Sequence, residues 1–465
     1  NVAIGYTALT ATTGDDNTAV GAYALAANTT ATNNVAVGRA AMYATTTGAG
    51  NTAIGTSAME ANTTGANNVA VGKFALDANT TASNNTAVGN ASLGANTTGA
   101  SNVAVGKDAL AANTTADSNV AVGMNSLKVN TTGTGNTAMG FNSMDANTTA
   151  GNCTGLGYNS LSANTTGGEN TAVGSQSLAA NSAGNYNTAV GQNSLNDNTT
   201  ANSNTAVGYA SLAVNTTGTP NTAVGYGALD ANTTGGSNTA IGANALGANT
   251  TASHNIALGS DAGNSITTGF ANTLLGTGAG NSITDGNYII SIGYNTDSSS
   301  SGADNQIVMG DSVAGNANNS FCFGTGSTDS AIAFGATSIT APSDVRLKED
   351  IQDEEVGLDF INELRPVTFQ WKKAKDVPAE MKAHSDSEER VMNGKYNHGF
   401  VAQEVKEVID KYDLKEGFDM WTEDEVDGRQ RIGEGALIPI LTKAVQELSA
   451  EVEELKSKMH DKCEE

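Results

Sequence analysis

The hydrophobic and polar positions of the first 310 residues recur with a fixed period of 17 residues. Each repeat carries the unit Asn-Thr/Val-Ala-Val/Ile-Gly. Its glycine stands at residues 21, 38, 55, 72, 89, 106, 123, 140, 157, 174, 191, 208, 225, 242, 259, 276, 293 and 310, and an earlier copy, ending at Gly5, is one residue out of step. A disordered low-complexity segment has no reason to keep such a register, whereas the coils of a solenoid must keep it in order to stack. The pattern therefore predicts a parallel β-roll or β-solenoid rod over residues 1–301.

Each repeat predicts two short strands and two corners. Val or Ile precedes the glycine, as at Val20 and Ile54, and a second apolar residue, such as Leu25, follows four positions after it. We expect both apolar columns to face the interior of the coil. The alanine that precedes the Val or Ile, such as Ala19 between Thr18 and Val20, would lie on the opposite face of the strand and let backbones approach closely. Gly and Asn permit the positive φ angles of the corners.

The core of such a coil is thin. One Val and one Leu contribute ~4 kcal/mol, against an ordering cost of roughly 1–2 kcal/mol for every residue of the coil. Ladders of stacked Asn and Thr side chains would add stability, and so would the association of several chains. We therefore expect an oligomeric rod, about 85 Å long if its coils are spaced ~4.8 Å apart.

The composition changes abruptly near residue 343. Only four of the 22 Lys and Arg residues precede Ser343, whereas both Trp residues follow it. The periodicity fades after Gly310, so residues 302–342 predict an irregular β neck. We place the domain boundary between Pro342 and Ser343, and we expect one domain over residues 343–433 and a closing helix over residues 434–465.

The closing helix carries apolar residues that step alternately by three and four positions, which is the a/d pattern of a coiled coil. These seam residues are Ile438, Leu441, Val445, Leu448, Val452, Leu455 and Met459. β-Branched a positions with Leu at d favour two strands. The alternative is an ordinary amphipathic helix that lies on a globular core.

Charge and cysteine content exclude several classes of protein. The net charge is −25, which argues against nucleic acid as a partner, because phosphate binding needs clustered Lys and Arg. No apolar run is long enough to span a membrane. Cys153, Cys322 and Cys463 are too few and too far apart for a disulfide framework or a metal site, so we expect no metal and no cofactor.

The repeats Asn-Thr-Ala-Val-Gly and Asn-Val-Ala-Val-Gly resemble the head repeats of trimeric autotransporter adhesins. The resemblance covers roughly residues 1–310. It implies a left-handed parallel β-roll in each chain of a trimer, although the repeats of that family are somewhat shorter than 17 residues.

The last 123 residues carry three further motifs. They are Ser343-Asp-Val-Arg-Leu-Lys348, Leu364-Arg-Pro-Val-Thr-Phe-Gln-Trp371 and Gly399-Phe-Val-Ala-Gln-Glu-Val405. Their order, followed by a coiled coil, resembles the C-terminal intramolecular chaperone of phage tailspikes and tail fibres, the chaperone of endosialidase family.

This resemblance implies a small α+β chaperone domain that associates as a trimer, holds three chains in register while the rod folds, and then cuts itself off. It also implies a Ser–Lys dyad with Ser343 as the nucleophile and Lys348 as the general base. The bond cleaved would be Pro342–Ser343. The resemblance implies three chains, whereas the seam residues by themselves favour two. We follow the resemblance.

The dyad is chemically reasonable. A Ser hydroxyl is a weak nucleophile that needs a base, and Lys acts as one only when burial or nearby cations keep it neutral. Arg346 could supply such a field, and Asp344 could orient Lys348 or cap a turn. Residues five apart do not share a helix face, so a tight turn or trimer contacts must bring Ser343 and Lys348 together. The enzyme would act once on itself, with no external substrate.

The repeats and the histidines allow other interpretations, which the sequence disfavours. Twelve Asn-Thr-Thr triplets match the N-glycosylation acceptor, but we expect the Asn and Thr to form corners and ladders. The adjacent Thr pairs alternate faces, which disfavours an ice-binding surface, and the motif of calcium-binding rolls is missing. For His384 and His398 we expect structural hydrogen bonds.

Together these observations predict a homotrimeric viral fibre, assembled in the host cytoplasm and then part of the extracellular virion. Its partners would be its own copies, a host-cell receptor or glycan, and a virion protein reached through sequence upstream of Asn1. The alternative is a bacterial trimeric surface adhesin, which would need a membrane anchor. A glycan-cleaving tailspike would need clustered carboxylates, but only 16 acidic residues are scattered through the first 342 residues.

Overall fold

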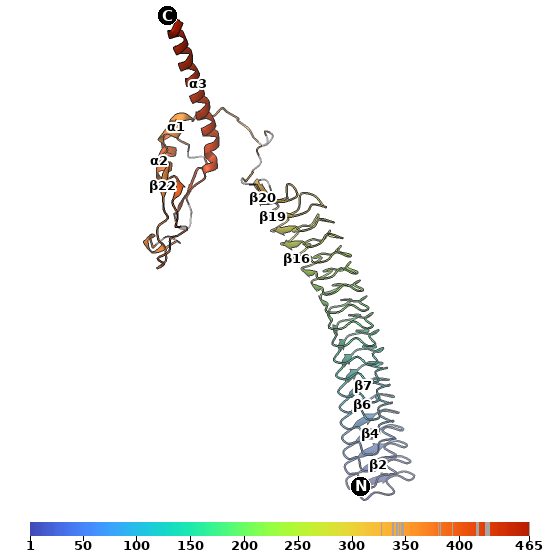
Figure 1. Cartoon of the computed structure of the whole chain (residues 1–465). Coiled ribbons are helices and arrows are strands. Elements are labelled where there is room, and N and C mark those ends of the chain that lie inside the picture. The colour runs from blue at the N-terminus through green and yellow to red at the C-terminus, as the bar shows by residue number, and fades with distance from the viewer. Residues whose placement is uncertain are drawn as a thin grey trace. The chain divides into compact units, whose positions relative to one another are not determined.

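The structure is a computed structural model. It describes the chain except for residues 327, 337–338, 341–342, 344, 346–347, 380, 382, 393, 415–417, 424–427 and 465, and the side chains of residues 461–464. The chain divides into two compact units, Asn1–Pro342 and Ser343–Glu465 (Figure 1).

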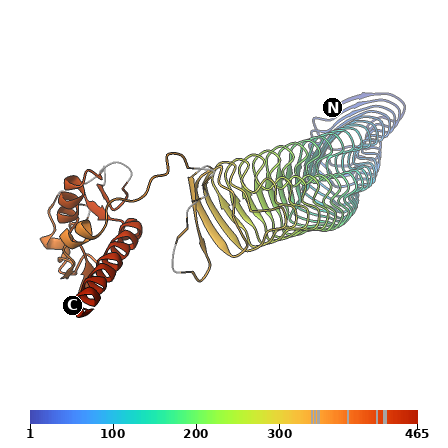
Figure 2. The ribbon, with the colours of Figure 1, turned by 90° about the horizontal axis from the view of Figure 1, so that it is seen from above.

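The first unit is the predicted solenoid of 17-residue coils, with short parallel strands stacked one per coil. These strands are β1 (Val2–Ile4), β2 (Thr18–Val20), β3 (Val35–Val37), β4 (Thr52–Ile54), β5 (Val69–Val71), β6 (Thr86–Val88), β7 (Val103–Val105), β8 (Val120–Val122), β9 (Thr137–Met139), β10 (Thr154–Leu156), β11 (Thr171–Val173), β12 (Thr188–Val190), β13 (Thr205–Val207), β14 (Thr222–Val224), β15 (Thr239–Ile241), β16 (Ile256–Leu258), β17 (Thr273–Leu275) and β18 (Ile290–Ile292). Thr52 pairs with Val69, one full repeat away, whereas Val2 pairs with Thr18, which confirms the short first step. Successive coils keep nearly the same outline when viewed from above (Figure 2).

The orientation predicted for the strand residues was wrong. The central alanine of the strands, such as Ala19, is fully buried inside the coil, whereas flanking residues such as Val20 are only half-buried. The physical reason is space: a coil this narrow accepts a methyl group from the strand, while the longer Leu column fills the interior from the opposite wall. Leu25 and its equivalents are fully buried, as predicted.

The second predicted strand of each coil is a turn segment instead. Leu25 has a φ of 49° and Tyr23 a φ of 64°, which lie in the left-handed region and not in the β region. Coil-to-coil hydrogen bonds nevertheless persist: the Tyr23 N–H donates to the Tyr6 carbonyl (2.8 Å), and the Leu25 N–H donates to the Ala41 carbonyl (3.1 Å). The backbone of this turn segment therefore forms hydrogen bonds with the coil before it and the coil after it, although it is not a β-strand.

Two ladders of buried asparagines connect the coils. In the first ladder, the Asn51 backbone N–H donates to the Asn34 Oδ1 (2.9 Å). In the second ladder, which contains the Asn of the Asn-Thr-Thr triplets, the Asn79 Nδ2 donates to the Asn62 Oδ1 (2.9 Å) and to the Ala82 carbonyl (3.0 Å). Each amide thus satisfies buried polar groups of two coils, as a polar interior requires.

Longer strands end the solenoid. β19 (Gln306–Asp311) and β20 (Ser320–Thr325) still pair in parallel, with Gln306 opposite Ser320. β21 (Thr328–Ala333) then runs antiparallel to β20, and Ala331 exchanges two backbone hydrogen bonds with Thr340. The reversal of direction occupies the last edge of the parallel stack, where an open edge would invite further strand pairing.

The second unit is a small α+β unit that ends in a helix. Its elements are α1 (Leu358–Glu363), β22 (Val367–Phe369), η2 (Ala374–Asp376), β23 (Asn397–Gly399), α2 (Ala402–Lys411), β24 (Trp421–Glu423), β25 (Gln430–Ile432), η3 (Glu434–Ala436) and α3 (Leu437–Glu464). β22 pairs with β23, and β24 with β25, both antiparallel. Phe360, Leu364, Val405, Ile409 and Met420 form its core with the start of α3.

Candidate functional site

Ser343 and Lys348 are in direct contact at the start of the second unit. The Lys348 Nζ donates a hydrogen bond to the Ser343 Oγ at 2.8 Å. This distance lies within the range that a nucleophile and its base need for proton transfer. The two residues singled out in the sequence are therefore within hydrogen-bonding distance of each other.

The contact forms within a single chain, in which the Lys348 backbone N–H also donates to the Val345 carbonyl at 3.2 Å. Asp344, Arg346 and Pro342, which the sequence suggested as supporting residues and as the other side of the cleaved bond, lie outside the described residues. In the single chain both Ser343 and Lys348 are exposed to solvent.

The second and third motifs of this unit meet through an ion pair. The Arg365 Nε donates to the Glu404 Oε2 at 2.9 Å, and a second guanidinium nitrogen contacts the Glu404 Oε1. These hydrogen bonds keep the pKa of Glu404 below its usual value. Beside this pair, Leu364 and Val405 are buried in one core. The pair ties the C-terminal end of α1 to the first turn of α2.

A second long-range contact joins α1 to α3. The Leu358 backbone N–H donates to the Glu447 Oε2 at 2.8 Å, so that α3 satisfies a free donor at the first residue of α1. Sequence reasoning found neither this contact nor Arg365–Glu404. No local pattern marks partners that lie 89 or 39 residues apart.

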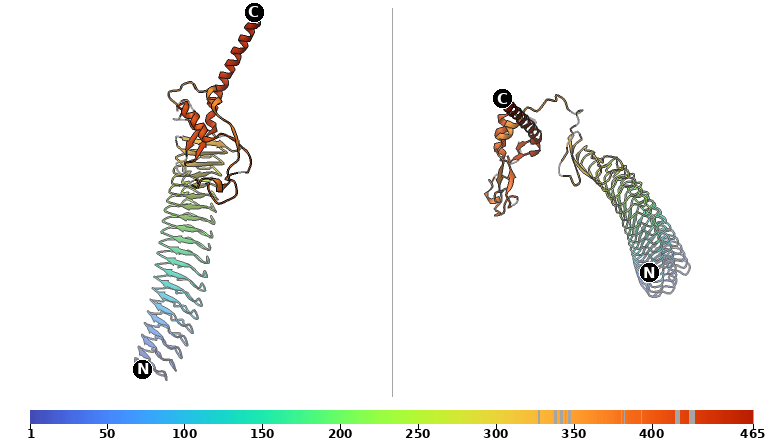
Figure 3. Two further views of the ribbon diagram at one scale, coloured as in Figure 1. Left: turned by 90° about the vertical axis from the view of Figure 1, so that its left-hand side faces the viewer. Right: turned by 45° about the horizontal axis from the view of Figure 1, so that its top comes forward.

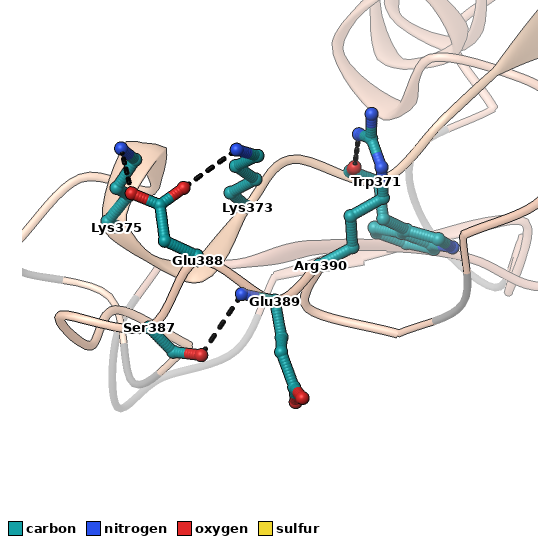
Figure 4. Close-up of polar contacts among 7 residues, drawn as sticks. All are labelled: Trp371, Lys373, Lys375, Ser387, Glu388, Glu389 and Arg390. Carbon is teal, nitrogen blue, oxygen red and sulfur yellow. Dashed lines mark hydrogen bonds and ion pairs between the residues drawn. The ribbon is translucent and has the colours of Figure 1, made fainter.

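The segment between β22 and β23 folds back on itself (Figure 4). Lys373 and Lys375 both donate to the Glu388 carboxylate, and Arg390 donates to the Trp371 carbonyl. The hydrogen bond from Lys373 is the main reason why the pKa of Glu388 is lowered. Because the side chains of Lys373, Lys375 and Glu388 are exposed, we assign their ion pairs a role in the shape of the segment and only a small one in stability.

The histidines show no catalytic grouping. The His384 Nδ1 lies 2.7 Å from the Val377 carbonyl, in keeping with the expected structural hydrogen bond. His398 lies in β23, opposite Thr368. Among the described residues, no cluster of His, Cys, Asp and Glu could hold a metal ion, and no helix is long and apolar enough to cross a membrane.

Helix α3 presents two different faces. Leu437 and Ile440 are buried in the core of the unit, and Ala444 is buried one turn further on. The predicted seam residues are all exposed in the single chain: Ile438, Leu441, Val445, Leu448, Val452, Leu455 and Met459. The globular core therefore uses other residues of α3 and leaves the heptad seam uncovered.

The Asn-Thr-Thr triplets are not available for glycosylation in the folded rod. The asparagine of all twelve triplets is fully buried. Its Nδ2, the atom that a glycan would occupy, instead donates within the ladder, as at Asn113 and Asn130. This agrees with the structural interpretation of the triplets.

Comparison with known proteins gives one family. Residues 343–414 match the family model described as chaperone of endosialidase. Curated proteins and solved structures gave no significant match to the chain. The matched segment contains the Ser343–Lys348 contact and the Arg365–Glu404 pair. The chain therefore combines a 17-residue-repeat β-solenoid with a small unit whose residues 343–414 are similar to the chaperone of endosialidase family, and this combination fits a tail-fibre-like protein with a chaperone domain.

Proposed function

We propose that this protein is a homotrimeric viral fibre whose C-terminal domain brings three chains together, assists folding of the rod and cleaves the Pro342–Ser343 bond. The observation that carries the proposal is the 2.8 Å contact between the Lys348 Nζ and the Ser343 Oγ, within a segment that matches the chaperone family. The exposed heptad seam of α3 supports self-association. Attachment to a host cell and a place in the virion belong to the same proposal.

The contact between Ser343 and Lys348 supports the following cleavage step. Lys348 in its neutral form accepts the Ser343 hydroxyl proton, and the Oγ adds to the Pro342 carbonyl carbon. The C–N bond then breaks, Lys348 returns the proton to the departing Ser343 amine, and an ester links the two parts. Water hydrolyses this ester and leaves a carboxylate on Pro342. No cofactor is needed.

Association of the chains would provide the neutral lysine. Both members of the dyad are exposed in the single chain, and a general base must be unprotonated to accept a proton. Contacts with neighbouring copies would remove Lys348 from water and favour its neutral form. Cleavage would therefore follow assembly, so that the chaperone leaves only after it has acted.

The intact mass of the recombinant chain tests the proposal. We expect the wild type to give two fragments separated between Pro342 and Ser343. Ser343→Ala and Lys348→Ala should each remain uncut, and native mass spectrometry should show a trimer for all three proteins. Lys348→Arg is the matched control, because it keeps the positive charge but cannot become a neutral base; it should also remain uncut.

An uncut trimer of the wild type would remove the peptidase role and keep the assembly role. A monomer would contradict the fibre. The alternative, a bacterial trimeric surface adhesin, would show the same trimer but would be found on a cell envelope and not in purified virus particles.

A further inference from the structure

Two aromatic side chains stack on one another on the surface of the rod. Successive coils lie one above the next (Figure 3), and Phe141 and Tyr158 occupy the same position in neighbouring coils, directly after the repeat glycine. Their ring centroids are 5.8 Å apart and their planes differ by only 9°. Phe141 is 39% and Tyr158 52% exposed. The coils before and after carry Met124 and Ser175 at this position, so the stack is two rings long and offers a ligand an apolar aromatic surface.

A polar pocket adjoins the two aromatic residues. It has a volume of about 290 Å³ and is lined by Asn142, Asp145, Asn159, Ser162 and Ala163. Asn142 and Asn159 directly follow the stacked aromatic residues in the chain. Amide, carboxyl and hydroxyl groups therefore converge next to an exposed apolar surface. Ligand sites in proteins combine these two features, an apolar surface and a few placed polar groups.

A column of asparagine side chains is interrupted at this pocket. The Asn125 Nδ2 donates to the Asn142 Oδ1 of the next coil at 3.1 Å. The following step of the column is missing, because the Asn159 Oδ1 is buried and has no hydrogen-bond partner among the described residues. A buried amide oxygen without a partner is unfavourable. Turning the Asn159 side chain toward a hydroxyl group in the pocket would restore the missing hydrogen bond.

The charge around the pocket favours a neutral ligand. The first 342 residues hold 16 acidic and four basic residues, so the rod would repel an anion. None of the residues that line the pocket is a cation. Partial burial raises the pKa of the Asp145 carboxyl, and backbone N–H groups and the charge of Lys128 offset only part of this effect. A carboxylate withdrawn from water accepts strong hydrogen bonds from hydroxyl groups.

We infer that the Phe141–Tyr158 stack and the adjoining pocket bind a neutral saccharide of the host-cell surface. A sugar ring suits both halves of the site, because it has an apolar C–H face and a polar edge. The C–H face would pack against the aromatic surface, and hydroxyl groups would donate to the Asp145 carboxylate and the Asn159 Oδ1. The inference rests on the proposed attachment to a host cell and adds the site and the class of its ligand.

The rod contains a second aromatic stack that serves as an internal comparison. Tyr209 and Tyr226 occupy the same position four repeats further along. Their ring centroids are 5.4 Å apart and their planes differ by 12°. Ala210 and Gly227 take the places of the two asparagines. This stack therefore has the aromatic surface without the amides, and we expect it to contribute little to sugar binding.

Sugar binding by the full-length chain tests the inference. The probes are immobilised neutral oligosaccharides of glucose, galactose, mannose and N-acetylglucosamine, with sialylated and sulfated oligosaccharides beside them. Calorimetry then measures the affinity for the neutral oligosaccharide that binds best. Tyr158→Ala should weaken binding by about tenfold or more, and Asn159→Gly by about threefold to tenfold. Both variants should fold, because Ala243 and Gly227 stand at these positions in other coils, and circular dichroism checks this.

Tyr226→Ala is the matched control and should bind with the affinity of the wild type. The inference would be overturned by a protein that binds none of the neutral oligosaccharides, or that binds only the sialylated or sulfated ones. It would also be overturned if the two site variants kept full affinity, or if Tyr226→Ala lost as much as Tyr158→Ala. Native mass spectrometry of the same samples separates the two proposals. A trimer that binds no sugar contradicts this site alone, whereas a monomer contradicts the proposed fibre even if it binds sugar through Tyr158.

Discussion

Buried asparagine side chains hold neighbouring coils together, and Asn113 illustrates this at the scale of the residue. Its Nδ2 donates to the Asn96 Oδ1 and the Ala116 carbonyl, and its Oδ1 accepts from Asn130. Asn113→Ala removes one hydrogen bond from each of three buried groups. The Ala116 carbonyl keeps its bond from Asn102 and the Asn130 Nδ2 keeps its bond to Gly133, whereas the Asn96 Oδ1 is left unpaired, at about 1–3 kcal/mol if it finds no water. We expect the free energy of unfolding, measured by denaturant titration, to fall by about 2–4 kcal/mol. Amide hydrogen exchange in the flanking coils should become faster. Thr115→Ala, at an exposed corner, should change stability by less than about 0.5 kcal/mol; equal losses for both variants would contradict a structural ladder.

At the scale of the element, α3 should separate folding from association. Ile440 is buried in the core of the second unit, so Ile440→Ala should lower the free energy of unfolding of this unit by about 2–5 kcal/mol. Val445 and Leu448 are exposed seam residues. Val445→Ser with Leu448→Ser should leave the fold of each chain intact but shift the full-length protein toward monomer at low concentration. Thermal unfolding and sedimentation at several concentrations measure the two effects; a seam variant that unfolds without dissociating would show that these residues serve the core.

At the scale of the whole molecule, stability should depend on the register of the coils. Deleting Thr171–Asn187 joins Asn170 to Thr188 and removes one coil while both ladders stay aligned. Deleting one residue fewer, 172–187, puts an extra residue into a coil that has neighbours on both sides. We expect the first deletion to fold with a near wild-type denaturation midpoint and the second to be less stable by at least about 2 kcal/mol, because buried amides lose their partners. Equal midpoints would mean that the corners absorb register errors freely.

The sequence by itself determined the features that repetition and local chemistry control. The unbroken register of 17 residues specified a parallel solenoid, because every coil must offer the same groups to the next. The repeat pattern also predicts that the Leu column faces the interior. The spacing of apolar residues predicts the seam of α3, because helical periodicity depends only on neighbours along the chain. The sequence required either a tight turn or trimer contacts to bring Ser343 and Lys348 together, and it did not decide between the two.

Only the tertiary structure decided which side of each strand faces inward. A three-residue strand with apolar residues at both ends and alanine at the centre, such as Val35–Val37, fits either orientation by its pattern. The choice depends on the width of the coil, which the Leu side chains of the opposite wall set. The left-handed turn that replaces the second strand, and the contacts Arg365–Glu404 and Leu358–Glu447, likewise depend on residues that are distant in sequence and adjacent only after folding.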